Sequence, residues 1–196
     1  MNVKAQGLLN AAKYIEETYG RDALGQVLRR CSPAVRETYT TSIAINWHPL
    51  EELCEFVDVA EATLGGGRGK LAQDIGAAGA RANMKGMLLR VAFYWGKPEY
   101  LMTRIVALWR QFNDEGTMHL LHMEGSEAQI EVRGIVAPKA TLCRMLTGWC
   151  IELAIGLGGR LVTGVHTECR ALGGKRCVWV VKGKVDEQGL GPRPKT

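Results

Sequence analysis

The stretch HTECRALGGKRC, residues 166–177, places two cysteines, a histidine and a glutamate around a Gly-Gly turn. With the turn centred on Gly173, Cys169 and Cys177 are equidistant from it and lie opposite each other across a hairpin. Opposed residues on paired strands have Cβ atoms roughly 4.5–5.5 Å apart. That separation suits two thiolates on one tetrahedral zinc ion, with Zn–S bonds of about 2.3 Å. A disulfide across the hairpin is the competing interpretation, which a reducing compartment disfavours.

A structural zinc site needs two more ligands, because four protein groups close such sites. Cys143 and Cys150 share one face of a predicted helix, but they lie about 10.5 Å apart along its axis, so only one of them can join. His166 is a candidate for the fourth position. It lies three residues before Cys169, and a regular strand would point it the other way. The prediction therefore requires a β-bulge or an irregular strand end.

The elements that must position these residues follow from the spacing of apolar side chains. Helices are predicted at residues 6–19, 22–30, 33–41, about 49–60, 70–94 and 97–112. The pattern then changes to two hairpins, with strands at 117–124 and 128–136 and at 160–171 and 176–182, separated by a helix at about 139–156. This order predicts an α+β domain whose antiparallel sheet is covered by helices on one side.

Composition limits the classes of function that fit the chain. The 196 residues carry a formal net charge of +5 without the basic stripe of a nucleic-acid-binding domain. No apolar run is long enough to span a membrane. Six cysteines without a predicted export signal indicate reduced thiols in the cytoplasm.

Motifs of the common enzyme classes are also missing from the sequence. The LGGGRGK stretch departs from the phosphate-loop pattern, since three residues separate Gly65 from Gly69 and Leu71 follows Lys70. No serine lies in a nucleophile elbow, and no carboxylate pair is distinct from the solvated helix faces. None of these motifs therefore indicates a known class of enzyme.

The spacing Cys143 … His166-x-x-Cys169-x7-Cys177 resembles the zinc site of 4-vinyl-reductase-type domains, the sensory module of phenol-responsive transcription activators. In those domains the ligands are a helical cysteine and a Glu-x-x-Cys-x7-Cys hairpin. The resemblance implies that Cys143, Cys169 and Cys177 are the three thiolate ligands. His166 stands where the family usually has glutamate, and Glu168 is the nearest substitute for it.

A broader resemblance covers most of the chain, most specifically from Trp47 to Val181. The stretches INWHPLEELCEFVDVAE and WGKPEYLMTRIVALWRQFNDEGTM are similar to uncharacterised bacterial proteins of this length that are abundant in myxobacteria. These families share a fold group with heme-NO-binding and vesicle-tethering Bet3-like domains. That kinship implies N-terminal helices followed by antiparallel β-hairpins covered by helices. The heme branch holds propionates with Tyr-x-Ser-x-Arg, and the nearest match here, Tyr100 to Arg104, has Met102 in the serine place.

The resemblance implies a non-catalytic, zinc-containing sensory domain that acts through an unknown protein partner. A small apolar or aromatic ligand would lie between the helices and the sheet, and the candidate lining residues are Phe93, Trp95, Trp109, His122 and Trp149. The alternatives are a Bet3-like scaffold or tethering protein without a ligand, and a heme-binding sensor.

The predicted domain organisation follows from the resemblance to these families and from the composition of the C-terminal residues. We predict an N-terminal helical segment at residues 1–31 that makes a homodimer. A ligand-binding domain of the 4-vinyl-reductase type follows at 32–182. Residues 183–196, rich in glycine, proline and basic side chains, are predicted to form a disordered tail.

Overall fold

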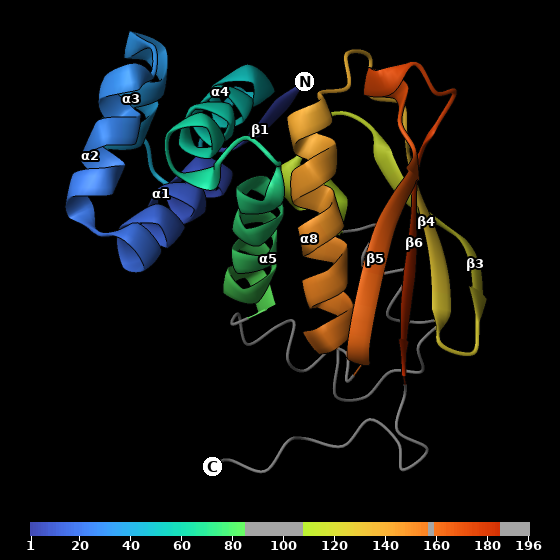
Figure 1. The fold of residues 1–196 in the computed structure, drawn as a ribbon. Helices are drawn as coiled ribbons and strands as arrows, with labels where there is room; N and C mark the ends of the chain where they lie inside the picture. The colour runs from blue at the N-terminus through green and yellow to red at the C-terminus, as the bar shows by residue number, and fades with distance from the viewer. Residues whose placement is uncertain (85–107, 157–158, 185–196) are drawn as a thin grey trace.

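The structure is a computed structural model that describes residues 1–84, 108–156 and 159–184. It confirms the predicted α+β class: helices occupy the N-terminal half and an antiparallel sheet the C-terminal half (Figure 1). The N-terminal elements are β1 (Asn2–Lys4), α1 (Gln6–Tyr19), α2 (Arg21–Arg30), α3 (Pro33–Thr41), β2 (Trp47–Pro49), α4 (Leu50–Ala60), a π-helical turn (Glu61–Gly65) and α5 (Lys70–Met84). The C-terminal elements are β3 (Thr117–Glu124), β4 (Glu127–Arg133), α8 (Ala140–Gly156), β5 (Arg160–Glu168), a short 3-10 helix (Arg170–Leu172) and β6 (Cys177–Lys184).

The four-stranded sheet has the order β3-β4-β6-β5, and all its neighbouring strands are antiparallel. Helix α8 lies between this sheet and α5, and α1 to α4 lie on the far side of α5 (Figure 1). Side chains of α8 therefore contact the sheet on one face of the helix and α5 on the other. This central position makes α8 the element that connects the two halves of the molecule.

Most predicted boundaries agree with the structure to within a few residues, and two strand ends differ for physical reasons. The strand predicted at 160–171 ends at Glu168, because the chain turns into the 3-10 helix before the hairpin tip. The strand predicted to end at 136 stops at Arg133, because the next residue, Gly134, adopts a left-handed conformation with φ of 76°. Strands β1 and β2 were not predicted, since three-residue strands carry too little periodicity to detect; they pair Asn2 with Pro49.

Parts of three predictions fall on residues that the structure does not describe. The helix predicted at 70–94 is described as far as Met84, and the one at 97–112 from residue 108. The predicted tail begins inside β6, which continues to Lys184, and the rest of it lies outside the described residues. Phe93 and Trp95 are also outside them.

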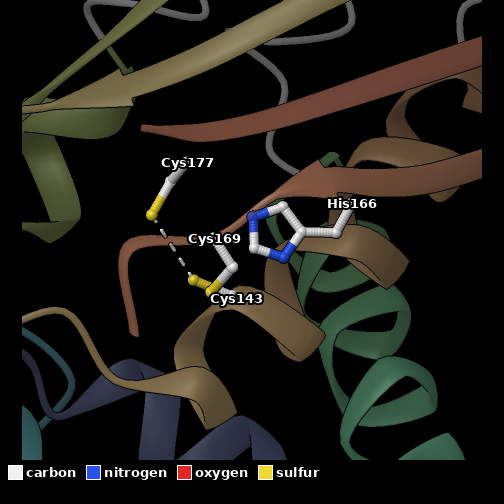
Figure 2. A group of neighbouring side chains, drawn as sticks. All are labelled: Cys143, His166, Cys169 and Cys177. Atoms are coloured by element: carbon white, nitrogen blue, oxygen red, sulfur yellow. Dashed lines mark hydrogen bonds between the residues drawn. The ribbon is translucent and has the colours of Figure 1, made fainter. Parts of the chain in front are cut away.

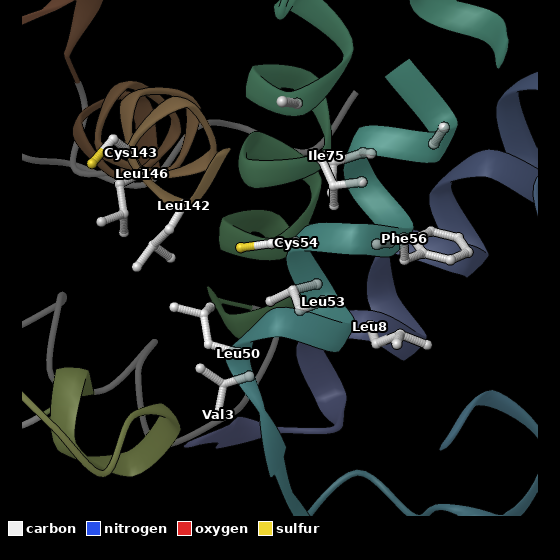
Figure 3. Close-up of a cluster of buried hydrophobic side chains, with 14 of the residues drawn as sticks. Val3, Leu8, Leu50, Leu53, Cys54, Phe56, Ile75, Leu142, Cys143 and Leu146 are labelled. Carbon is white, nitrogen blue, oxygen red and sulfur yellow. The ribbon is translucent and has the colours of Figure 1, made fainter. Parts of the chain in front are cut away.

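One continuous core joins the N-terminal helices to the sheet (Figure 3). Residues 1–31, predicted as a separate dimerisation segment, contribute the buried side chains of Leu8, Ile15 and Val27 to this core. At the other end of the core lie Leu142 and Leu146 of α8 and Trp179 of β6. No helix among the described residues combines the length and hydropathy needed to cross a bilayer.

Helices α5 and α8 approach each other through two glycines. A Cβ atom built on Gly76 would lie 1.9 Å from the carbonyl oxygen of Met145, and one built on Gly148 would lie 1.8 Å from that of Gln73. Any side chain at either position would push the helices apart. The close crossing therefore depends on glycine at both positions.

Candidate functional site

Four side chains from three elements converge beside the N-terminal part of α8 (Figure 2). Cys143 lies in the first turn of α8, His166 on β5, Cys169 just after β5, and Cys177 at the start of β6. Their ligand atoms, one sulfur or ring nitrogen from each, all lie within 4.8 Å of one another. Cys143 and Cys177, which are 34 positions apart in the sequence, thus belong to one compact group of three cysteines and a histidine.

The spacing of these atoms matches a tetrahedral metal site. The Sγ atoms of Cys143 and Cys177 are 3.9 Å apart. In a tetrahedron with Zn–S bonds of about 2.3 Å, two sulfurs are separated by about 3.8 Å. This pair of sulfurs therefore has the separation expected of two ligands of one zinc ion.

A β-bulge brings His166 to the same side of the hairpin as Cys169. His166 pairs with Trp179 across β5 and β6, but Glu168 pairs with Val178, so the register shifts by one residue between them. In a regular strand, residues three apart point to opposite faces. The shift at Thr167 reverses this and supplies the irregularity that the predicted site required.

Glu168 has a different role from His166. Its carboxylate accepts hydrogen bonds from the backbone N–H groups of Lys175 at 2.9 Å and Arg176 at 3.0 Å, and from the Arg176 guanidinium at 3.3 Å. Desolvation would raise the pKa of Glu168, but these donors outweigh it and hold the pKa below its usual value. Glu168 therefore closes the loop at the hairpin tip, and it is His166 that reaches the three sulfurs.

Burial shifts the pKa values of two members of the group. Burial, followed by the neighbouring Cys177 and Cys169, raises the pKa of the Cys143 thiol far above its usual value. Burial lowers the pKa of His166, which keeps the imidazole neutral and able to coordinate a metal. The Nε2 atom of His166 is buried and has no hydrogen-bond partner among the described residues. A divalent cation would offset the thiolate charges and give this nitrogen its missing partner.

The second helical cysteine does not belong to the group. Cys150 is buried on α8, and burial alone raises the pKa of its thiol to about 12. It is absent from the four residues whose ligand atoms converge. Of the two helical candidates that the sequence offered, only Cys143 lies at the hairpin.

A cavity of about 130 Å³ lies on the other side of α8. Residues of α1, α4, α5, α8 and the segment 108–113 line it, together with Val3, Lys4 and Met118. Most of the lining is apolar, and it includes Trp109 and Trp149, two of the residues that the resemblance put forward for a ligand pocket. The amide side chains in the lining are Gln6, Asn10, Asn83 and Asn113.

His122, also predicted to line the pocket, lies elsewhere. It is on β3, its side chain is 56 % exposed, and its Nε2 atom is 3.4 Å from the carboxylate of Glu124. A register shift between Leu120 and His122 interrupts the pairing of β3 with β4 just before it. The resemblance put His122 forward for the pocket, and a local irregularity of this kind is not visible in the spacing of residues along the strand.

Two groups of residues near the sites were not singled out from the sequence. Trp179 stacks on His166, with ring centroids 4.2 Å apart. Its position could have been found, because Trp179 is two residues after Cys177 on the same strand and must share its face. The amides Gln6 and Asn83, whose side chains are 3.5 Å apart across α1 and α5, are not marked by any local pattern.

No protein-family model matches this sequence, and no curated protein matches it either. The structure is similar to solved H-NOX (heme-NO-binding) proteins. One, from S. oneidensis in the Fe(II) ligation state, is 11% identical, covers 96% of this chain and 100% of its own, and has a TM-score of 0.71. Another, from K. algicida in the Fe(II) unliganded state, is 6% identical, covers 94% of this chain and 98% of its own, and has a TM-score of 0.67. At these identities the likeness shows that the chain has the H-NOX fold. The likeness to 4-vinyl-reductase-type domains and to myxobacterial proteins stays a prediction.

Proposed function

We propose that this chain is a non-catalytic cytoplasmic sensor domain with a structural zinc ion at Cys143, His166, Cys169 and Cys177. In this proposal it binds a small apolar or aromatic molecule in the cavity and signals through a protein partner. The observation that carries the proposal is the convergence of the four ligand atoms within 4.8 Å beside a helix that also lines a cavity. The H-NOX fold supports a sensor, since solved proteins of this fold are described by their ligation states.

Helix α8 places the two sites on a common element. Cys143 is on the side that faces the hairpin, while Met145, Leu146 and Trp149 line the cavity. A metal bound at Cys143 would fix the start of α8, and with it one wall of the cavity. The metal then has a structural role that prepares the ligand site.

The size and polarity of the cavity support a neutral ligand of about one ring. A volume of about 130 Å³ is close to that of a roughly 150 Å³ apolar cavity that holds benzene. Among the described lining residues, Lys4 carries the only charge. Its ammonium group is bound to the carbonyl of Ile45 at 2.6 Å and lies over the ring of Trp47. The neutral amides would instead orient a hydroxyl or carbonyl group, as in a phenol.

Heme is the second candidate, and the fold similarity favours it. Protein ligands of heme iron are usually His, Cys, Met or Tyr. Among the described lining residues, Met118 and Met145 are of these types, and no histidine or cysteine lines the cavity. The sequence of residues 85–107 contains neither His nor Cys. The described residues therefore provide poor axial ligands, and we derive no chemistry through heme.

We expect phenol to raise the melting temperature of the zinc-loaded protein in a concentration-dependent way. At ten times the Kd, binding stabilises the folded state by about 1.4 kcal/mol, or about 3–6 °C at this chain length. Trp149→Ala should abolish most of the shift because it removes a cavity wall. Trp47→Ala is the matched control, since Trp47 is 44% exposed and is not in the lining. A thermal-shift series with phenol, octanoate and hemin measures this.

The three ligands distinguish a pocket for a neutral ring, a heme sensor and a scaffold that binds no ligand. A shift with phenol but not octanoate supports a neutral ring. A stable Soret band after addition of hemin, with no shift from phenol, would favour the heme sensor. If none of the three shifts the wild type, the ligand proposal is wrong, and the scaffold or tethering function takes its place.

We also expect the protein to be a homodimer of about 43 kDa, twice the 21.5 kDa chain, assembled through its N-terminal helices. Deleting residues 1–31 would not test this, because the deletion removes core side chains. Tyr19, at the end of α1 and 43% exposed, is a suitable probe. Light scattering should show Tyr19→Glu with a lower particle mass than Val136→Glu, a control that is 81% exposed and lies outside the N-terminal helices. A monomeric wild type would contradict the dimer.

A further inference from the structure

The Nε2 atom of His166 is buried and has no hydrogen-bond partner among the described residues. A metal-binding histidine is normally oriented by a hydrogen bond from its second ring N–H to a carboxylate, a carbonyl or a water, and this bond fixes the orientation of the ring. A packed side chain that holds the plane of the imidazole would add to that restraint.

Trp179 is such a side chain. It pairs with His166 across β5 and β6, and their rings are stacked with centroids 4.2 Å apart and planes inclined by 8°. Trp179 is itself 1% exposed, so its indole has no room to turn. The stack covers one face of the imidazole. The edge of the ring that carries its nitrogens is directed toward the cysteines (Figure 2).

The indole is in turn tied to another residue of the site. Its Nε1–H donates to the hydroxyl of Thr147 at 3.0 Å, and this hydroxyl donates to the carbonyl of Cys143 at 3.0 Å. Two hydrogen bonds and one ring stack thus connect the histidine ligand on β5 to the backbone of the cysteine ligand on α8. The contacts join the two elements that must stay aligned for the four ligands to meet.

We infer that Trp179 is the positioning residue of the metal centre: by stacking on His166 it presets the imidazole for coordination and sets the affinity of the site for zinc. This rests on the proposed zinc centre. Partners that orient a ligating histidine typically contribute about 10–100-fold to metal affinity. The same loss is expected when the stack is removed.

The test compares Trp179→Phe with Trp179→Leu. Both variants lack the indole N–H and both leave a smaller apolar side chain, but only phenylalanine keeps a ring over His166. Zinc affinity is measured by competition with a chromophoric chelator, on protein whose fold is checked by circular dichroism. We expect Trp179→Leu to bind zinc about 10–100-fold more weakly than wild type. Trp179→Phe should stay close to wild type.

The same substitutions in a His166→Cys background show whether the effect passes through the imidazole. A thiolate needs no ring orientation, so Trp179→Leu should cost little affinity there, and Co²⁺ spectra should report four sulfur ligands. Equal losses in both backgrounds, or equal losses for Phe and Leu, would overturn the inference, because Trp179 would then act only through stability. If the wild type binds no zinc, the proposed centre itself fails.

Thr147→Val gives an independent measurement should Trp179→Leu not fold. It removes the acceptor of the indole N–H and nearly preserves the side-chain volume. The buried indole N–H is then left without an acceptor, and a shift of the ring to find another one would disturb the stack on the imidazole, so we expect a loss of up to about tenfold in zinc affinity. Phenylalanine has no such N–H group and is not subject to this effect. This loss should disappear with His166→Cys. A loss that persists in that background would contradict a role through the ring of His166.

Discussion

Cys177→Ser is expected to lower the metal content from about one zinc per chain to nearly none and to unfold the β5–β6 hairpin. A preformed site does not exist in the unfolded chain, so the free energy of metal binding is also free energy of folding. At zinc concentrations about 1,000 times the Kd, the ion stabilises the native state by about 4 kcal/mol. Its loss should lower the melting temperature by about 8–16 °C. Elemental analysis and circular dichroism measure the two effects.

Cys150→Ser is the matched control for this prediction. Cys150 is buried on the same helix, but it is not among the converging ligands, so the variant should keep its zinc. Loss of metal from it would mean that the helical ligand is not Cys143. A wild type without zinc, with Cys169 and Cys177 joined by a disulfide after reducing purification, would remove the metal centre altogether.

The convergence of the three cysteines and His166 was predictable to the extent that it depends on local chain geometry. The equal spacing of Cys169 and Cys177 about Gly173 predicts that they meet, and Gly173 does adopt a left-handed conformation, with φ of 91°. The need for a bulge near His166 could also be deduced from strand alternation. What the spacing does not reveal is which side chain holds the imidazole, because Trp179 reaches it only through strand pairing.

The cavity was less predictable, because it depends on helices that meet across the molecule. Trp109 and Trp149 could be proposed as lining residues on the basis of a resemblance, but the amides of Gln6 and Asn83 come from helices far apart in the sequence. His122 was misplaced because a register shift precedes it. Packing between distant helices and local irregularities in strands are set by tertiary contacts, which a single sequence does not display.

Gly148→Ala is expected to lower the stability of the fold strongly, because Gly148 lies where α5 and α8 cross. The new Cβ atom would lie 1.8 Å from the carbonyl oxygen of Gln73. Close carbon–oxygen contacts between helices are normally about 3.3 Å or more, so the two backbones would have to separate by roughly 1.5 Å. Overpacking of this kind costs about 3 kcal/mol when neither side can move away easily. The atom that the new Cβ would meet belongs to the backbone of α5, which cannot rotate away as a side chain can. We therefore expect the full destabilisation of about 3 kcal/mol.

Gly148→Ala should therefore lower the melting temperature by about 6–12 °C, and Gly76→Ala by a similar amount. Gly79→Ala on the same helix α5 is the control, because a Cβ there would have no neighbour within 4 Å. Alanine also favours a helix over glycine by about 1 kcal/mol, so this variant should be as stable as wild type or more so.

A separation of α5 and α8 would also displace residues at both candidate sites, because α8 carries Cys143 on one side and Trp149 on the other. Gly148→Ala should bind zinc more weakly than Gly79→Ala does. Because Gly79 lines the cavity, phenol binding by Gly148→Ala is compared with that of wild type, and it should also be weaker. If Gly148→Ala and Gly79→Ala melt within about 2 °C of each other, the helices are not held in backbone contact, and the rigid connection between metal and cavity fails with it.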